Sequence, residues 1–116
     1  MSIKQDNFLD VIFRVSNKLL YEVSEEGIVT ILIKQDHMIQ RFFRKLRVKI
    51  PEYRRITMDD FGSYAFLQID GHKTVREIGE ALEAEFGDKV QPLYERLSLF
   101  LRHIQDQYQY IEEVQL

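Results

Sequence analysis

The 116-residue chain contains no cysteine, and this absence removes several kinds of chemistry at the outset. Without a thiol there is no disulfide framework, no thiolate nucleophile and no zinc–thiolate site. The lack of cysteine is also compatible with a reducing compartment. Hydrophobic residues make up 45% of the chain and charged residues 30%, a balance that predicts one globular domain with one hydrophobic core.

Long apolar runs are absent as well. The N-terminal stretch MSIKQDNFLDVIFRV interrupts its apolar residues with Asp6 and Asp10, and no run of roughly 18 or more apolar residues follows it. We therefore expect a cytoplasmic protein with no membrane partner. The formal net charge of −3 is small, so the distribution of charge along the chain is more informative than its sum.

Motifs for catalysis and for cofactor binding are missing from the sequence. His37, His72 and His103 are scattered, and no HExxH or other paired metal-ligand spacing occurs. The glycines lie too far apart to form a phosphate-binding loop. No candidate acid or base has evident positioned partners. We predict no enzyme activity, no metal and no cofactor.

The residues that are present predict an α+β chain. Two runs rich in aliphatic, tyrosine and threonine residues, 18–23 and 27–34, are joined by a glycine-containing loop, which is typical of a hairpin. The second run is apolar on both faces, so it is expected to be central in a sheet. A third strand at 53–58 carries charge on both faces, so it is expected at an edge.

Between the second and third strands, apolar residues recur at helical spacing with basic residues between them. This pattern predicts an amphipathic basic helix near 37–47. The wider segment 41–55 contains seven Lys or Arg residues and one Glu. Two interpretations stay open. The segment is either a solvated face that aids solubility or a patch that attracts an acidic peptide or an acidic enzyme surface.

Three helices are predicted after the third strand. Thr57 and Asp60, three residues apart, predict a cap for the first helix. Thr74 and Glu77 predict a reciprocal capping box at the start of the second helix, and Gly87 predicts its end. The third helix is expected to begin between residues 88 and 92 and to end near residue 107, with a short terminal strand after it.

The third predicted helix carries more apolar surface than one small core requires. Its expected core stripe consists of Leu93, Leu97, Phe100 and Ile104. A second apolar row consists of Tyr94, Leu101 and Tyr108. A widely buried helix, a peptide groove and a dimer contact all explain this surplus.

The predicted fold is a small winged-helix-like α+β domain, with a three-stranded antiparallel sheet followed by a three-helix bundle. Such an arrangement raises the question of DNA binding. The second helix, however, would present Glu77, Glu80, Glu83 and Glu85 against a single Arg76. Phosphates repel such a helix, so recognition of the major groove is disfavoured.

The stretch from Ile56 to Ile104 resembles the PqqD-like family, the peptide-binding domains called RiPP recognition elements. The shared pattern is D-x-x-G-x-x-x-(aromatic)-x-x-I-D-G-x-x-T-V-x-E-I. Its positions in this chain are Asp59, Gly62, Phe66, Ile69, Asp70, Gly71, Thr74, Val75, Glu77 and Ile78. Phe66 departs from the tryptophan that is frequent there, and the basic helix is not part of the smallest members.

The upstream hairpin and the segment NFLDVIFRVSN are also similar to members of this family. The resemblance therefore implies a single PqqD-like domain over residues 1–116, with an N-terminal extension and a basic helix near 37–47. It implies a non-catalytic adaptor that holds the leader of a ribosomally synthesised precursor peptide and presents the peptide to a modifying enzyme, often a radical SAM protein. A winged-helix nucleic-acid-binding module or a general protein-interaction module is the alternative, and homodimerisation stays open.

In this family the leader adds as a strand beside the third strand and packs against the third helix. The residues expected to line the peptide site are Tyr53, Arg54, Arg55, Ile56, Thr57, Arg96, Leu97, Phe100, Leu101 and Ile104. Leu101 is expected to be the residue of this set that the core needs least. The sequence thus predicts a groove between the edge strand and the third helix.

Overall fold

The computed structural model describes residues 8–34, 37–47, 53–106 and 110–114 of the chain. The elements in chain order are η1 (Phe8–Asp10), β1 (Phe13–Val15), β2 (Leu20–Val23), β3 (Val29–Lys34), α2 (His37–Lys45), β4 (Tyr53–Thr57), α3 (Asp60–Gln68), α4 (Val75–Phe86), η2 (Gly87–Val90), α5 (Leu93–Asp106) and β5 (Ile111–Glu113). Each predicted helix and strand is present, and the boundaries move by a few residues.

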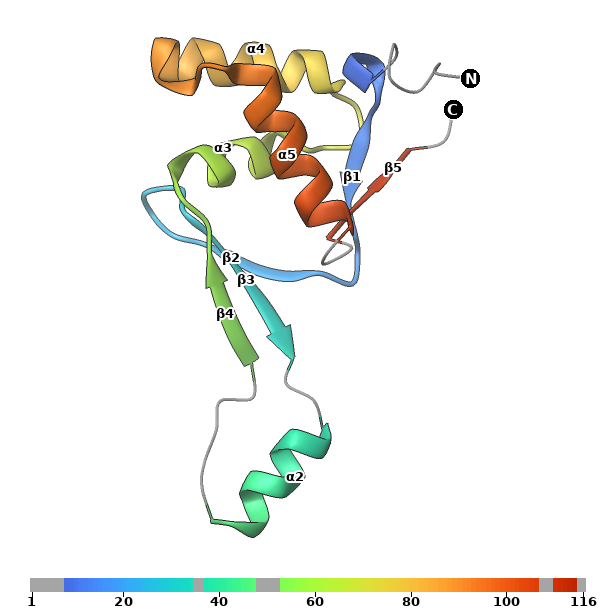
Figure 1. Ribbon diagram of the computed structural model, residues 1–116, viewed down its shortest axis with the longest axis vertical. Coiled ribbons are helices and arrows are strands. Elements are labelled where there is room, and N and C mark those ends of the chain that lie inside the picture. Colours follow the sequence, from blue (N-terminus) through green and yellow to red (C-terminus); the bar gives the residue numbers. More distant parts are fainter. Residues whose placement is uncertain (1–7, 35–36, 48–52, 107–109, 115–116) are drawn as a thin grey trace.

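Three strands form the main antiparallel sheet, in the order β2-β3-β4. Strand β3 is central, as its apolar faces predicted, and β4 is an edge strand, as its charges predicted. Helices α3, α4 and α5 follow the sheet in the chain and lie together at one end of it (Figure 1). The predicted α+β class, with a three-stranded antiparallel sheet and three following helices, is confirmed.

A second, two-stranded sheet pairs β1 with β5, a partner for the terminal strand that the sequence did not predict. Val15 faces Ile111, and the amide of Ser16 donates to the carbonyl of Tyr110 at 2.9 Å. The amide of Val75 at the start of α4 donates to the carbonyl of Val11. The segment from η1 to β1 is therefore part of the fold: it pairs with the last described strand and contacts the start of α4 (Figure 1).

One hydrophobic core lies between the sheet and the three helices. From the sheet, Val29 and Ile31 point into it, and both are fully buried. From α3 comes Phe66, the aromatic residue of the family pattern, which meets the edge of the Tyr21 ring at 5.1 Å between centroids. Such aromatic edge-to-face contacts add stability beyond the area they bury.

Helix α3 begins differently from the prediction. Its N-cap is Asp59, whose carboxylate accepts from the amide of Gly62 at 2.7 Å. The predicted pair of Thr57 and Asp60 is wrong, because Thr57 still belongs to β4 and Asp60 is already the first helical residue. An aspartate at the N-cap also places a negative charge at the positive end of the helix dipole.

Helix α4 begins and ends as predicted. The hydroxyl of Thr74 accepts from the amide of Glu77 at 3.2 Å, and the Glu77 carboxylate accepts from the amide of Thr74 at 2.9 Å. These two bonds form the capping box. At the other end, Gly87 has a φ of 64°, which is the left-handed conformation that a glycine adopts without strain.

A small hydrogen-bonded junction ties the sheet to α3. The amide of Met58, just after β4, donates to the carbonyl of Val29 at 2.9 Å. The amide of Val29 donates in turn to the hydroxyl of Ser63 on α3 at 2.8 Å, and Ser63 is only 1% exposed. The buried carbonyl and the buried amide of Val29 are thereby both satisfied, the carbonyl by the residue that follows β4 and the amide by α3.

Helix α2 lies far from this junction. It joins the ends of β3 and β4 that point away from the other helices, so it forms an arm at the opposite end of the molecule (Figure 1). The molecule measures 52 × 36 × 21 Å, and its radius of gyration is 16.9 Å. A compact domain of this length is expected near 13 Å, so the arm makes the protein elongated.

Replacing Ser63 with Ala is expected to lower the free energy of unfolding by about 1–3 kcal/mol, because the buried amide of Val29 loses its acceptor. The matched control is Ser24→Ala, which removes a serine that accepts from the exposed amide of Ile28 at 3.1 Å. Water can replace that acceptor, so the control should change stability by less than about 0.5 kcal/mol. Urea unfolding of the three proteins measures both effects, and equal losses would contradict the role of Ser63.

Candidate functional site

The outer edge of β4 is one of the two open edges of the three-stranded sheet, and the outer edge of β2 is the other. Because Met58 and Ile56 direct their main-chain groups toward β3, the alternation of an antiparallel ladder turns those of Tyr53, Arg55 and Thr57 outward. No strand in the described part of the chain pairs with this edge. The edge therefore offers amides and carbonyls to an added strand.

The side chains of β4 divide between two faces of the sheet. Ile56 lies opposite Ile31 and packs against the core, whereas Arg55 lies on the outer face. The Arg55 guanidinium donates two hydrogen bonds to the Glu22 carboxylate, at 2.9 and 3.1 Å. These bonds, together with the charge of Arg55, hold the pKa of Glu22 below its usual value. Both arginines of the strand are exposed, but Arg55 is paired with Glu22 within the sheet.

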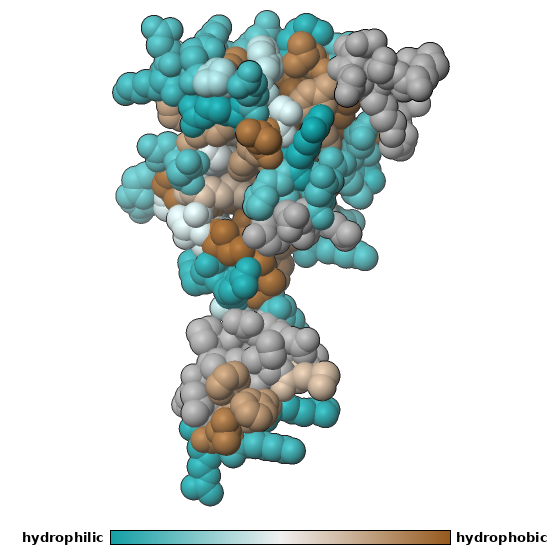
Figure 2. All heavy atoms as spheres, in the orientation of Figure 1, coloured by the Kyte–Doolittle hydropathy of each residue, from teal (hydrophilic) through white to brown (hydrophobic). Residues whose placement is uncertain are grey.

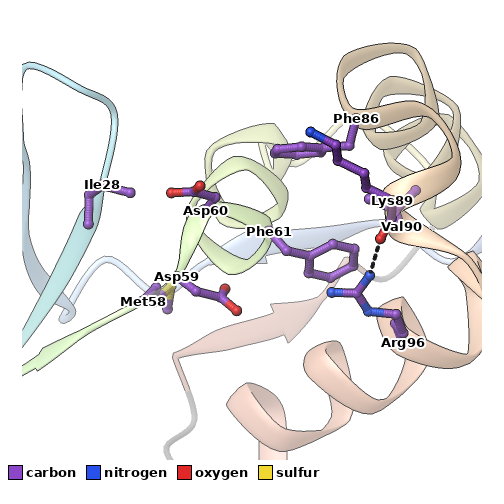
Figure 3. Close-up of a pocket in the computed structure, with 9 residues that line it drawn as sticks. All are labelled: Ile28, Met58, Asp59, Asp60, Phe61, Phe86, Lys89, Val90 and Arg96. Atoms are coloured by element: carbon purple, nitrogen blue, oxygen red, sulfur yellow. Dashed lines mark hydrogen bonds between the residues drawn. The ribbon is translucent and has the colours of Figure 1, made fainter.

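An open pocket of about 430 Å³ lies where β4 passes into α3 (Figure 3). Its lining residues come from the β2–β3 hairpin, the start of α3, the end of α4, η2 and the first turn of α5. They are Ile28, Met58, Asp59, Asp60, Phe61, Phe86, Lys89, Val90 and Arg96. Five of them are apolar, and the charged ones balance in sign. The pocket therefore suits an apolar group framed by polar contacts.

Arg96 is held firmly at the wall of this pocket. Its guanidinium lies over the ring of Phe61, 4.4 Å from the centroid, and donates to the carbonyl of Lys89 at 2.9 Å (Figure 3). The Phe61 ring also meets the edge of Phe100, with 6.3 Å between centroids. Cation–π and aromatic contacts of this kind fix the side chains before any ligand arrives.

Gly62 allows Phe100 to reach this position. A Cβ atom at residue 62 would lie 3.1 Å from the Phe100 ring and 3.0 Å from the Asp59 carboxylate. Both distances are tighter than ordinary contacts, so the Asp59 cap and the seat of Phe100 depend on a glycine. The Asp59 and Gly62 positions of the family pattern thus shape the pocket wall as well as starting α3.

The structure brings only part of the predicted peptide site to the surface. Residues 53–57 form the open edge, and Arg96 and Phe100 stand near its end. In contrast, Leu97 and Leu101 are 0% exposed and Ile104 is 3% exposed, so these three belong to the core. The expectation that the core needs Leu101 least is wrong.

The physical reason is the orientation of α5. The row that faces the core consists of Leu93, Leu97, Leu101 and Ile104. Phe100 sits beside this row and is only partly buried. Leu93, Leu97 and Ile104 lie in the core as predicted, and Leu101 takes the place that was expected for Phe100. The pocket residues Met58, Phe61 and Lys89 were missed, although the sequence pattern around Asp59 and Gly62 pointed to their neighbourhood.

Other kinds of site find no support in this part of the molecule. Among the described residues, no group of His, Asp and Glu side chains is arranged to hold a metal ion. No described helix has both the length and the apolar character needed to cross a bilayer.

The fold and the site together define a small α+β domain with an open strand edge beside a preformed pocket. A family profile for coenzyme PQQ synthesis protein D (PqqD) matches residues 50–108, and the chain belongs to this family. The match extends from just before β4 to just after α5, so it includes the edge and every lining residue of the pocket except Ile28. No curated protein and no solved structure matches the chain.

Replacing Leu101 with Ala is expected to lower the free energy of unfolding by about 2–5 kcal/mol, because a fully buried leucine leaves a cavity. The control is Leu99→Ala on the same helix, where the side chain is 70% exposed and the change should stay within about 0.5 kcal/mol. Thermal and urea unfolding compare the two. A Leu101 variant as stable as the Leu99 variant would contradict the assignment of Leu101 to the core.

Proposed function

We propose that this protein is a non-catalytic adaptor that binds an extended peptide along β4 and presents it to a modifying enzyme. The peptide is the leader of a ribosomally synthesised precursor, and the enzyme is a biosynthetic partner such as a radical SAM protein. Membership of the PqqD family supports the accessory role. The observation that carries the proposal is the open edge of β4, which ends at the pocket of Arg96 and Phe61.

Strand addition gives the peptide its position. The outward amides and carbonyls of Tyr53, Arg55 and Thr57 repeat every second residue, which is the spacing of an added strand. Main-chain bonds of this kind carry affinity but read no side chains. Selectivity must therefore come from the surroundings of the edge.

The pocket supplies that selectivity. An added strand that continues past Thr57 meets Met58 and Phe61, and one of its apolar side chains can enter between these residues and Phe86. Arg96 and Phe100 would line the side toward α5. Arg54 supplies exposed positive charge on the strand, which speeds the encounter with an acidic leader more than it strengthens the complex.

The absence of catalysis in this proposal rests on the family and on the chemistry of the surface. Two of the four charged side chains around the pocket form structural bonds: Asp59 caps α3, and Arg96 donates to the backbone carbonyl of Lys89. The bound peptide would therefore be held and handed over without reaction. We propose the cytoplasm as the compartment, because precursor peptides leave the ribosome there. A homodimeric form remains compatible with the proposal.

A proline at position 55 tests strand addition directly. Arg55→Pro removes an amide that points outward, and edge strands tolerate proline where the amide is not used in the sheet. Peptides selected from a random display library against the parent protein serve as ligands. Their binding to Arg55→Pro, measured by calorimetry, is expected to fall at least tenfold, and the amides of Tyr53 and Thr57 should be protected from hydrogen exchange by peptide only in the parent.

Two control variants test whether the loss of binding comes from the outward amide of β4. Val23→Pro removes an outward amide from the opposite edge of the same sheet, on β2, and should leave peptide binding unchanged. Arg55→Ala keeps the amide and removes the ion pair with Glu22, so it separates the loss of main-chain bonding from the loss of charge. If Val23→Pro abolishes binding and Arg55→Pro does not, the peptide uses the other edge and the proposal is wrong.

Nucleic-acid binding is the alternative that the arrangement of α3 and α4 invites. The exposed carboxylates of α4 oppose it, since Glu77, Glu80, Glu83 and Glu85 all face solvent on the helix that would read a groove. Mobility-shift titration with random duplex is therefore expected to show only weak binding that disappears as salt rises from 50 to 200 mM. Tight, sequence-selective binding at physiological salt would replace the adaptor with a regulator.

A further inference from the structure

Helix α2 exposes an apolar face that contributes nothing to the core. Met38, Phe42 and Leu46 are 77%, 59% and 56% exposed. Met38, Phe42, Phe43 and Leu46 are neither in the hydrophobic core nor among the side chains packed against it. The Phe42 ring contacts its own neighbour, Phe43, at 5.5 Å between centroids. Figure 2 shows the apolar side chains of the arm gathered beside its hydrophilic ones.

The charges of the same helix all have one sign. Arg41, Arg44, Lys45 and Arg47 are exposed, and residues 37–47 contain no Asp or Glu. The chain as a whole carries a formal charge of −3, so the remainder of the molecule is acidic. A basic, strongly amphipathic helix that carries Phe and Leu on its apolar side is typical of a segment that lies in a membrane interface.

We propose that α2 anchors the protein to the surface of an anionic lipid bilayer. The apolar side chains would enter the boundary between headgroups and acyl chains, and the arginines and lysine would remain among the anionic headgroups. The position of α2 favours this occupant, because the arm lies at one end of the longest dimension of 52 Å. A flat surface reaches α2 there before it meets the acidic helix α4 near the other end (Figure 1).

A second copy of the chain is a poorer occupant. The described element with the most exposed carboxylates, and so the strongest attraction for α2, is α4, with Glu77, Glu80, Glu83 and Glu85. None of the exposed large hydrophobic residues of the described chain lies on α4. That helix could neutralise the charges of α2 but could not cover Phe42 and Leu46. An anionic bilayer does both at once.

The expectation of no membrane partner rested on the absence of a long apolar run. A helix that lies in the interface plane needs no such run, because only one of its faces enters the bilayer. The exposure of Phe42 and Leu46, which periodicity alone could not reveal, is what changes the conclusion. The anchor is independent of the peptide edge, and it would hold that edge and its cargo near the membrane.

Co-sedimentation with lipid vesicles tests the proposal. The full chain is expected to sediment with vesicles of phosphatidylcholine and phosphatidylglycerol in equal amounts, and to remain in the supernatant with phosphatidylcholine alone. Binding should weaken steeply as salt is raised, because screening reduces the attraction of the basic side chains. Absence of sedimentation with anionic vesicles at low salt would overturn the proposal.

Two matched pairs of variants separate the apolar and the charged contributions. The double variant Phe42→Ser, Leu46→Ser should lose binding, whereas Leu99→Ser, which changes an exposed leucine on α5, should bind like the parent. The triple variant Arg41→Gln, Arg44→Gln, Lys45→Gln should weaken binding about a hundredfold, since each charge contributes roughly fivefold. Neutralising the exposed Lys18 and the half-buried Lys73 on the body should change binding little. Variants of α2 that bind like the parent would overturn the proposal.

The chain contains no tryptophan, so a single introduced one reports its own surroundings. The emission of Phe42→Trp should shift to the blue on anionic vesicles and be quenched by brominated acyl chains, and that of Leu99→Trp should do neither. Sedimentation equilibrium without lipid tests the competing possibility that α2 forms a dimer contact. A dimer that Phe42→Ser dissociates would make α2 a contact between copies and would overturn the membrane anchor.

Discussion

The hydrogen bonds of the Val29 backbone are the constraint on which the arrangement of this protein depends. The carbonyl of Val29 accepts from the amide of Met58 and its amide donates to the hydroxyl of Ser63, so one buried residue of the central strand holds both the end of β4 and the start of α3. An unsatisfied buried amide costs free energy, and this cost disfavours any other path for the chain between strand and helix. These bonds thereby fix the position of β4 relative to α3.

The candidate site is a direct product of this junction. Because β4 turns into α3 at Met58 and Asp59, the open strand edge ends where Phe61 and Arg96 form the pocket wall. Gly62 in the first turn lets Phe100 approach closely enough to pack against Phe61, which is part of that wall. In the proposed function, the same few residues would serve both stability and recognition, with one strand edge and one pocket holding the peptide.

The arm and the body of the protein divide two tasks between them. The body buries its apolar residues around Val29 and Phe66 and carries the acidic surface, whereas α2 exposes its apolar residues and carries a concentrated positive charge. A helix of this kind gains little from its own backbone, since short isolated helices are marginal in water. Covering its apolar face with another surface would stabilise the helix more. Because α2 is joined to the body through β3 and β4, such a surface would lie at a distance from α4 (Figure 1).

The sequence by itself determined the elements and their order. Alternation and glycine loops predicted the hairpin, charge on both faces predicted the edge strand, and the pair of Thr74 and Glu77 predicted the start of α4, because these signals act between residues close in the chain. Tertiary structure decided what spacing leaves open. It placed Leu101 rather than Phe100 in the core row of α5, kept Thr57 in β4 so that Asp59 caps α3, and paired β1 with β5, since each of these choices depends on packing between segments distant in sequence.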